Sequence, residues 1–363
     1  MATTEQLLQA LQAVIDPNTG KDFVSTKTLK NLQVEGGDVS FDVELGYPAK
    51  SQIPGIRQAL IAAAKGVAGV SNVSANVTSK ITAHAAQRGV ALLPQVKNIV
   101  AVASGKGGVG KSTTAVNLAL ALAAEGAKVG LLDADIYGPS QPTMLGLAGQ
   151  RPESEDGKTM IPLENFGVKV ISIGFLVEPD NAMIWRGPMA TQALEQLLRQ
   201  TNWKELDYLI VDMPPGTGDI QLTLSQRVPM TGAVIVTTPQ DIALLDAKKG
   251  VKMFEKVGVP ILGLVENMAV HVCTNCGHVE HIFGADGGKK MAAEYGMDYL
   301  GALPLDMQIR LQADSGKPTV VYDPDGEVAQ IYKAVARQVA VKIAAKAKDF
   351  SSKFPTIKVS KDT

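Results

Sequence analysis

The hydrophobic and polar positions follow two different patterns, which divide the chain near residue 80. In the first part, segments with helical spacing of apolar residues are mixed with segments in which apolar and polar residues alternate. Helical spacing covers 4–14 and 53–65, and alternation covers 29–34, 39–45 and 70–77. The sequence Glu35-Gly36-Gly37-Asp38 predicts a hairpin between the first two alternating segments. We therefore expect a small α+β domain at 1–79 and a linker at 80–97.

From residue 98 onward, short and almost wholly apolar segments alternate with longer helical ones. Strands buried on both faces have this pattern, so it predicts a mostly parallel sheet with helices on both sides. The expected strands are 99–103, 129–132, 168–173, 208–211, 232–236 and 261–265. The expected helices begin at Lys111 or cover 189–199, 244–257 and 327–347. The fold class is thus α/β, with a doubly wound sheet in 98–347 and a polar tail in 348–363.

The strongest motif lies between the first of these strands and the helix that follows. It fits the pattern G-x-x-x-x-G-K-[ST] and reads Gly105-Lys106-Gly107-Gly108-Val109-Gly110-Lys111-Ser112-Thr113. Glycines let successive N–H groups turn inward around phosphate oxygens, and the helix adds the positive end of its dipole. Lys111 would neutralise the β- and γ-phosphates, and the Ser112 hydroxyl would bind Mg²⁺. The motif therefore predicts a P-loop that binds ATP and Mg²⁺.

Carboxylates end two of the other predicted strands. Asp212 follows an apolar strand and leads into a glycine-rich loop, so we expect it on the Mg²⁺ side of the site, with the Gly216 amide sensing the γ-phosphate. A second strand ends at Asp133-Ala134-Asp135. One of these carboxylates could orient the attacking water, and we assign that role to Asp135. The alternative is that both side chains cap the following turn.

The bulk properties exclude several classes of protein. The 363 residues are 45% hydrophobic and 20% charged, with a formal net charge of −1, so broad attraction to nucleic acid or membrane is not expected. No apolar run approaches the ~20 residues that span a bilayer. With two cysteines, a disulfide framework is excluded and a reducing compartment is expected. We expect a cytoplasmic protein that binds neither nucleic acid nor membrane.

The P-loop contains a second lysine, and this lysine makes the loop resemble that of a known class of proteins. The GKGGVGKST form, with Lys106 directly after the first glycine, resembles the deviant Walker A motif of the MinD/nitrogenase-iron-protein class of dimeric ATPases. In that class the extra lysine reaches the nucleotide of the partner subunit. The resemblance implies a homodimer that holds two ATP molecules, with Lys106 acting across the interface.

Further segments look like the Mrp/ApbC family of iron–sulfur cluster carriers. They are Asp133-Ala-Asp135-Ile-Tyr-Gly-Pro-Ser140, Trp185-Arg-Gly-Pro188, Asp212-Met-Pro-Pro-Gly-Thr-Gly-Asp219, Glu266-Asn267-Met268 and Cys273-Thr-Asn-Cys276. The resemblance implies that Asp135 is the switch I carboxylate, that Asn267 contacts adenine and that Pro304 and Asp306 lie beside the base. It also implies slow ATP hydrolysis coupled to cluster carriage.

The N-terminal unit resembles a small domain that is fused to such carriers and also occurs alone in cluster-assembly proteins. Many stand-alone domains carry a cysteine after their second strand. The corresponding stretch here, Tyr47-Pro-Ala-Lys-Ser-Gln-Ile-Pro54, has none. A docking or regulatory role therefore fits this domain better than cluster ligation.

Both cysteines lie in one C-x-x-C, and two thiolates cannot complete a four-sulfur site. Two chains related by a two-fold axis would supply four, and in the resembled family such a site holds a bridging [4Fe–4S] cluster. Three alternatives stay open: a zinc knuckle that adds histidines, a redox dithiol and a plain structural loop. The histidines near Cys273 and Cys276 are His271, His278 and His281.

These features together predict an ATP-hydrolysing carrier that receives a cluster from a scaffold and passes it to acceptor apoproteins. The rival from another class is a positioning ATPase of the MinD/ParA type. Proteins of the MinD type end in a basic amphipathic helix that binds membrane. The last predicted helix here is rich in Ala and Val and fits core packing instead.

Overall fold

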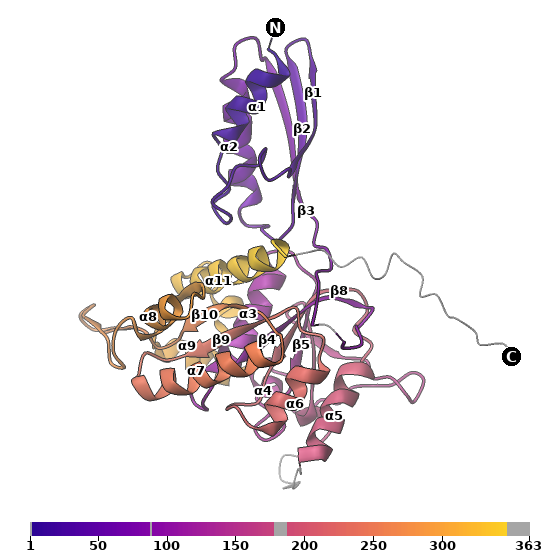
Figure 1. Cartoon of the computed structure of the whole chain (residues 1–363), viewed down its shortest axis with the longest axis vertical. Coiled ribbons are helices and arrows are strands. Elements are labelled where there is room, and N and C mark those ends of the chain that lie inside the picture. Colours follow the sequence, from indigo (N-terminus) through magenta and orange to yellow (C-terminus); the bar gives the residue numbers. More distant parts are fainter. Residues whose placement is uncertain (1, 88, 178–186, 347–363) are drawn as a thin grey trace, which may run out of the picture.

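The computed structural model describes residues 2–87, 89–177 and 187–346 of the chain (Figure 1). The polar tail predicted at 348–363 lies outside the described residues, as do the end of the predicted last helix at Ala347 and the residues Trp185 and Arg186. Among the described residues no helix is both long enough and apolar enough to cross a bilayer.

The N-terminal unit has its own sheet, with two helices packed beside it (Figure 1). Strands β1 (Leu29–Glu35) and β2 (Asp38–Leu45) form the predicted antiparallel hairpin, and β3 (Asn72–Ser79) pairs with β2 in parallel. Every second residue of β2 is buried, as its alternation predicts, because one face of the sheet packs against the helices. The helices are α1 (Thr4–Gln12) and α2 (Ile53–Lys65).

The main body has an eight-stranded sheet in the described residues, with the order β13-β10-β9-β4-β8-β5-β7-β6. All neighbouring pairs are parallel except β6 and β7. The strands are β4 (Val96–Ala103), β5 (Val129–Asp133), β6 (Leu163–Asn165), β7 (Val168–Ser172), β8 (Leu206–Asp212), β9 (Gly232–Thr237), β10 (Ile261–Glu266) and β13 (Tyr299–Ala302). The predicted α/β class with a mostly parallel sheet is confirmed. β4 begins at Val96, so the last two residues of the segment predicted as a linker, 96 and 97, belong to this strand.

Helices cover both faces of this sheet, because each crossover is right-handed and the chain steps from β4 toward one edge and later back toward the other. Helices α3 (Lys111–Ala124) and α11 (Glu327–Ala344) pack together on one face, and α5 (Gly187–Arg199), α6 (Asp219–Arg227) and α7 (Asp241–Lys256) lie on the other (Figure 1). All seven residues of the central strand β8 are buried. This two-sided burial explains why the strands have continuous apolar sequences.

Several short elements carry no clear sequence pattern and were not predicted. They are α4 (Gln141–Met144), α8 (Gly287–Glu294), α9 (Met307–Asp314), α10 (Thr319–Tyr322), the 3₁₀ turn Ile173–Phe175, the edge strands β6 and β13, and the ribbon of β11 (His271–Val272) and β12 (Val279–Glu280). Helix α6 was also not predicted. The elements of two to four residues are too short to show a period of 2 or 3.6, and α6, α8 and α9, with eight or nine residues, show only about two turns of one.

The buried sheet makes a first prediction. Leu131 in β5 is fully buried, so Leu131→Ala deletes packed methyl groups and leaves a cavity. We expect the free energy of unfolding of the main body to fall by about 2–5 kcal/mol, measured by urea unfolding followed by circular dichroism. Leu92→Ala, at a leucine that is 42% exposed, is the matched control and should leave the transition nearly unchanged. Equal shifts for the two variants would contradict this packing.

Candidate functional site

The glycine-rich loop joins β4 to α3 at the carboxyl edge of the sheet, as its sequence predicts. Gly110 precedes α3 with φ of 82°, a left-handed conformation that favours glycine. A Cβ on Gly110 would also lie 2.1 Å from the Asn267 side chain, and one on Gly105 would lie 2.1 Å from the backbone of Asp246 in α7. The loop is thus held between β10 and α7 at positions where only glycine fits.

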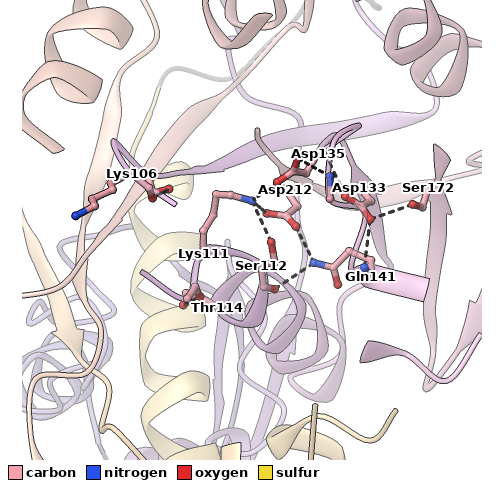
Figure 2. A network of polar contacts seen from close by, with 12 residues as sticks. Lys106, Lys111, Ser112, Thr114, Asp133, Asp135, Gln141, Ser172 and Asp212 are labelled. Atoms are coloured by element: carbon pink, nitrogen blue, oxygen red, sulfur yellow. Dashed lines mark hydrogen bonds and ion pairs between the residues drawn. The ribbon is translucent and has the colours of Figure 1, made fainter. Parts of the chain in front are cut away.

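Lys111, the first residue of α3, lies among the predicted carboxylates (Figure 2). Its side chain is only 6% exposed, and its Nζ lies 2.5 Å from Asp212 Oδ1, 3.0 Å from Ser112 Oγ and 4.0 Å from Asp135 Oδ2. The structure therefore brings together the four residues that the sequence assigned to phosphate, Mg²⁺ and water. The ammonium offsets the charge of carboxylates that would otherwise be buried unpaired.

Asp133 completes this group of acidic residues, although the sequence did not give it a definite role. It is fully buried and accepts hydrogen bonds from Ser172 Oγ at 2.9 Å and from the N–H groups of Gln141 and Asp135, each at 3.2 Å. Burial, together with the nearby Asp212 charge, raises the pKa of Asp133 to about 7. Burial also raises the pKa of Asp135, while the Lys111 charge opposes that rise.

Gln141 in α4 is a site residue that sequence reasoning missed. Its Nε2 donates to the Ser112 carbonyl at 3.1 Å and to Asp212 Oδ2 at 2.8 Å, so it joins the P-loop helix to the end of β8 (Figure 2). Its Oε1 is buried without a hydrogen-bond partner. A buried oxygen of this kind fits a hydrated cation, because a metal-bound water could donate to it. No sequence signal marks Gln141, since only the fold brings it to Asp212.

The group formed by Ser112, Asp212 and the free oxygen of Gln141 consists of oxygen donors. Mg²⁺ prefers oxygen ligands and keeps several of its waters in protein sites. The residues present therefore fit Mg²⁺, with Ser112 and Asp212 as the candidate ligands.

The predicted nucleotide contacts outside the P-loop come from three different segments of the chain. Asn267, just after β10, donates from Nδ2 to the Val109 carbonyl at 2.8 Å, so it contacts the loop itself. Pro304 and Asp306 follow β13, and Asp306 caps α9 by accepting from the Gln308 N–H at 2.7 Å. The Gly216 N–H donates to the Ser104 carbonyl at 3.1 Å. Contacts of these residues with adenine or γ-phosphate stay predictions.

Lys106 is exposed and points away from the group around Lys111 (Figure 2). Within the described part of the chain it forms no ion pair. It lines a pocket of about 230 Å³ with Gly107, Val109, Ile242 and Met268. The two lysines of one loop are therefore placed for different tasks, one inside the site and one at its surface.

The cysteines lie in the turn of the β11–β12 ribbon, Cys273 partly exposed and Cys276 exposed. The turn is closed by the Cys273 N–H, which donates to the His278 carbonyl at 2.9 Å, and by the Gly277 N–H, which donates to the Cys273 carbonyl at 2.8 Å. Backbone N–H groups of Cys276 and Asn275 face the Cys273 sulfur and lower the pKa of its thiol.

The nearby histidines do not complete a metal site in one chain. The Nδ1 atoms of His271 and His281 lie 3.0 Å and 2.9 Å from the carbonyls of Leu305 and Ala269, and His278 lies 3.8 Å from Glu280. In 2–87, 89–177 and 187–346 no three residues of the types His, Cys, Asp and Glu are placed to hold a metal. The zinc knuckle considered from the sequence is not assembled here.

The fold and the P-loop site define a P-loop NTPase. Residues 95–340 match a family model described as NUBPL iron-transfer P-loop NTPase, and residues 4–77 match one described as iron-sulfur cluster assembly protein. The chain belongs to the NUBPL iron-transfer P-loop NTPase family, and its N-terminal domain is of the iron–sulfur cluster assembly type.

Two relatives cover most of the chain. A protein of Pseudomonas fragi named iron-sulfur cluster carrier protein is 61% identical over 269 residues, which are 74% of this chain and 94% of that protein. A protein of Haemophilus influenzae with the same name is 49% identical over 338 residues, 93% of this chain and 91% of that protein. The second match includes the N-terminal domain.

Solved structures resemble the main body. A nucleotide-binding protein of Archaeoglobus fulgidus in complex with ADP is 36% identical, has a TM-score of 0.56, and the match covers 64% of this chain and 90% of that one. The cell division ATPase MinD of Pyrococcus furiosus is 22% identical with a TM-score of 0.50 over 67% of this chain and 98% of that one. The likeness to MinD shows a shared fold.

The donors around Cys273 predict a pH profile for its reactivity. The variant Cys276→Ser keeps the backbone N–H donor and leaves Cys273 as the one thiol. Because the pKa of Cys273 is lowered, its thiolate persists to a lower pH than the thiolate of an ordinary cysteine does. The rate of alkylation by iodoacetamide should therefore reach half its maximum at a lower pH in the folded variant than in the same variant in urea. Coinciding midpoints would show that the turn does not stabilise the thiolate.

Proposed function

We propose that this chain is an ATP-hydrolysing carrier that holds a [4Fe–4S] cluster between two subunits and transfers it to apoproteins. The observation that carries the proposal is the solvent-accessible pair Cys273 and Cys276 on a ribbon of a chain whose P-loop has a second, exposed lysine. One chain supplies two thiols, and a four-iron cluster takes four. Two copies related by a two-fold axis supply that number. The names of the relatives support iron–sulfur carriage.

The residues around Lys111 divide the work of binding and hydrolysis. The P-loop amides and Lys111 bind the phosphates, and Lys111 leaves Asp212 to do so. Mg²⁺, held by Ser112 and Asp212, would neutralise charge on the phosphate oxygens. Asp135 orients the attacking water, and Gln141 keeps Asp212 in place.

The second subunit covers the surface on which Lys106 lies. Two residues of α7 near this surface, Ile242 and Leu245, are 65% and 59% exposed, and Ile242 lines the same pocket as Lys106. Large apolar side chains exposed around a charged group are typical of surfaces that a partner buries. Lys106 then reaches the nucleotide of the facing subunit, and each site is complete only in the dimer.

A short stretch of chain joins the nucleotide site to the cysteines. Asn267 contacts the Val109 carbonyl of the P-loop, and six residues later Cys273 begins the ribbon turn. The ribbon is held to this stretch by His281 on the Ala269 carbonyl. A movement of the P-loop on nucleotide binding therefore reaches Cys273 and Cys276 through the chain from Asn267 to Cys273. The hydrogen bonds of Asn267 to Val109 and of His281 to Ala269 connect this segment at its two ends. The partners are an iron–sulfur scaffold that loads the cluster and apoproteins that accept it.

The positioning ATPase is the second candidate and has the same fold. Helix α11 argues against it, because Tyr332, Val335, Ala336 and Val339 are buried against the body. A helix used in this way does not present an apolar face to a membrane. The cysteine ribbon would also have no task in such a protein.

Anaerobic reconstitution with iron and sulfide tests the carrier function. We expect about four irons per dimer, because one cubane cluster takes four cysteine thiolates. Metal analysis, visible absorption and size-exclusion chromatography measure this together. Cys273→Ser and Cys276→Ser should each lose the absorption band and the iron, while the exposed Ser74→Ala leaves both. One zinc per chain and no stable cluster would overturn the proposal.

The two lysines of the P-loop should separate binding from hydrolysis. Lys111→Ala removes the buried ammonium, so we expect nucleotide affinity to fall at least about tenfold. Lys106→Ala leaves the site of one subunit intact, so nucleotide binding should stay near wild type while ATP hydrolysis falls about 10²-fold or more. Fluorescent ADP titration and a phosphate-release assay measure the two effects. Normal hydrolysis by Lys106→Ala would rule out its action across the interface.

A further inference from the structure

The N-terminal domain contacts the main body at a place that the carrier function does not explain. The loop between β2 and α2, residues 46–52, lies over the end of α3, beside α11 (Figure 1). The Lys50 N–H donates to the Glu125 carbonyl at 3.1 Å. The Ser51 N–H and Oγ donate to the Glu125 carboxylate at 2.9 Å and 2.6 Å. This loop therefore faces the body of its own chain.

Glu125 stands at a position that disfavours a carboxylate. It is the C-cap of α3, where the helix dipole is negative, and it is 1% exposed. Both effects would destabilise the charge unless donors compensate for them. Three described groups donate to its carboxylate. Two are the N–H and the Oγ of Ser51, and the third is Arg337 Nη1, which lies 2.5 Å from Oε1. The N-terminal domain thus supplies two of the three.

Arg337 extends the contact from α11 into the N-terminal domain. Its Nε donates to Asn18 Oδ1 at 3.2 Å, and Asn18 Nδ2 in turn donates to the Tyr47 hydroxyl at 3.2 Å. The Tyr47 hydroxyl donates to the buried carboxylate of Asp16 at 2.7 Å. A chain of polar groups, buried except for the half-buried Asn18, therefore runs across the boundary between the two domains, and separating the domains breaks it.

The helix that ends at Glu125 begins at Lys111. Helix α3 has 14 residues, and nine consecutive ones, 114–122, are buried. Its Asn117 Oδ1 also accepts from the Val320 N–H of α10 at 3.1 Å. A helix packed on all sides moves as one body, since a close-packed core leaves no room for it to bend freely. The phosphate site and the domain contact are thus at opposite ends of one rigid element.

We propose that the contact of Ser51 with Glu125, which also binds Arg337, is a latch that couples docking of the N-terminal domain to nucleotide binding. Docking satisfies Glu125 and holds the last turn of α3, and α3 in turn positions the P-loop amides and Lys111. Nucleotide therefore binds more tightly when the domain is docked. Because coupling is reciprocal, bound nucleotide strengthens docking by the same factor. The inference rests on nucleotide binding at the P-loop and does not depend on the cluster.

Ser51→Asp tests the latch without changing the main body. It removes the hydrogen bond from Ser51 Oγ and places a second carboxylate against Glu125, and the remaining backbone N–H bond does not balance the repulsion, so the domain should undock. Ser74→Asp, on the exposed face of β3, adds the same charge to the same domain and is the matched control. Small-angle X-ray scattering and trypsin cleavage after the exposed Lys80 report docking of the full chain. Titration with fluorescent ADP and Mg²⁺ reports affinity.

We expect Ser51→Asp to enlarge the radius of gyration, to speed cleavage and to weaken ADP binding about fivefold or more, the usual range for coupled sites. ADP should slow cleavage of the wild type and of Ser74→Asp. Glu125→Gln, which keeps the shape but loses the charge pair with Arg337, should act in the same direction. Undocking with unchanged affinity would overturn the coupling, and a domain that stays docked in both variants would overturn the latch. If the wild type did not bind ADP at all, the nucleotide site itself would be refuted. Cluster loading is measured in a separate experiment.

Discussion

The buried ammonium of Lys111 is the charge on which the site depends. Asp133, Asp135 and Asp212 all lie at one edge of the sheet and are all buried, and buried carboxylates require compensating donors or cations. Lys111 contacts Asp212 directly and lies near Asp135, while Asp133 is left with a raised pKa and three hydrogen-bond donors. In the proposed function, phosphate draws Lys111 away from Asp212, and a divalent cation would then balance the charge of that carboxylate.

The sheet topology is what brings these charges together. β8 pairs with β4 on one side and with β5 on the other, and all three run in parallel. Their carboxyl ends therefore meet, and the P-loop, Asp212 and Asp133 follow those ends directly. Because α3 fills the space beneath the loop, its buried packing also fixes where Lys111 stands. Through Glu125 at its other end, the same helix connects the site to the N-terminal domain, whose Ser51 is 74 residues from Glu125 in the chain but hydrogen-bonded to it.

The two cysteines illustrate a different use of structure. They lie on a two-stranded ribbon outside the main sheet, where nothing in the described part of the chain completes a metal site. A thiol pair with lowered pKa for Cys273 and with histidines bound to backbone carbonyls is suited to a ligand shared with another molecule. The exposed Lys106 is suited to the same arrangement. The solvent-accessible cysteine pair and the exposed Lys106 both fit the proposed arrangement, in which two copies of the chain face each other.

The sequence by itself determined the α/β class, the P-loop and the carboxylates after two strands, because these depend on local patterns: continuous apolar strands, glycines where the backbone must turn, and acidic residues at strand ends. It could not place Gln141, whose role comes from its contact with Asp212 71 residues away. It also missed β6, β13 and the cysteine ribbon, which are too short to carry a period and form by packing at an edge. The link from Ser51 to Glu125 and Arg337 was decided by tertiary structure alone. The stability of a buried charge depends on the groups that surround it, and the order of residues in the chain does not specify which distant groups these will be.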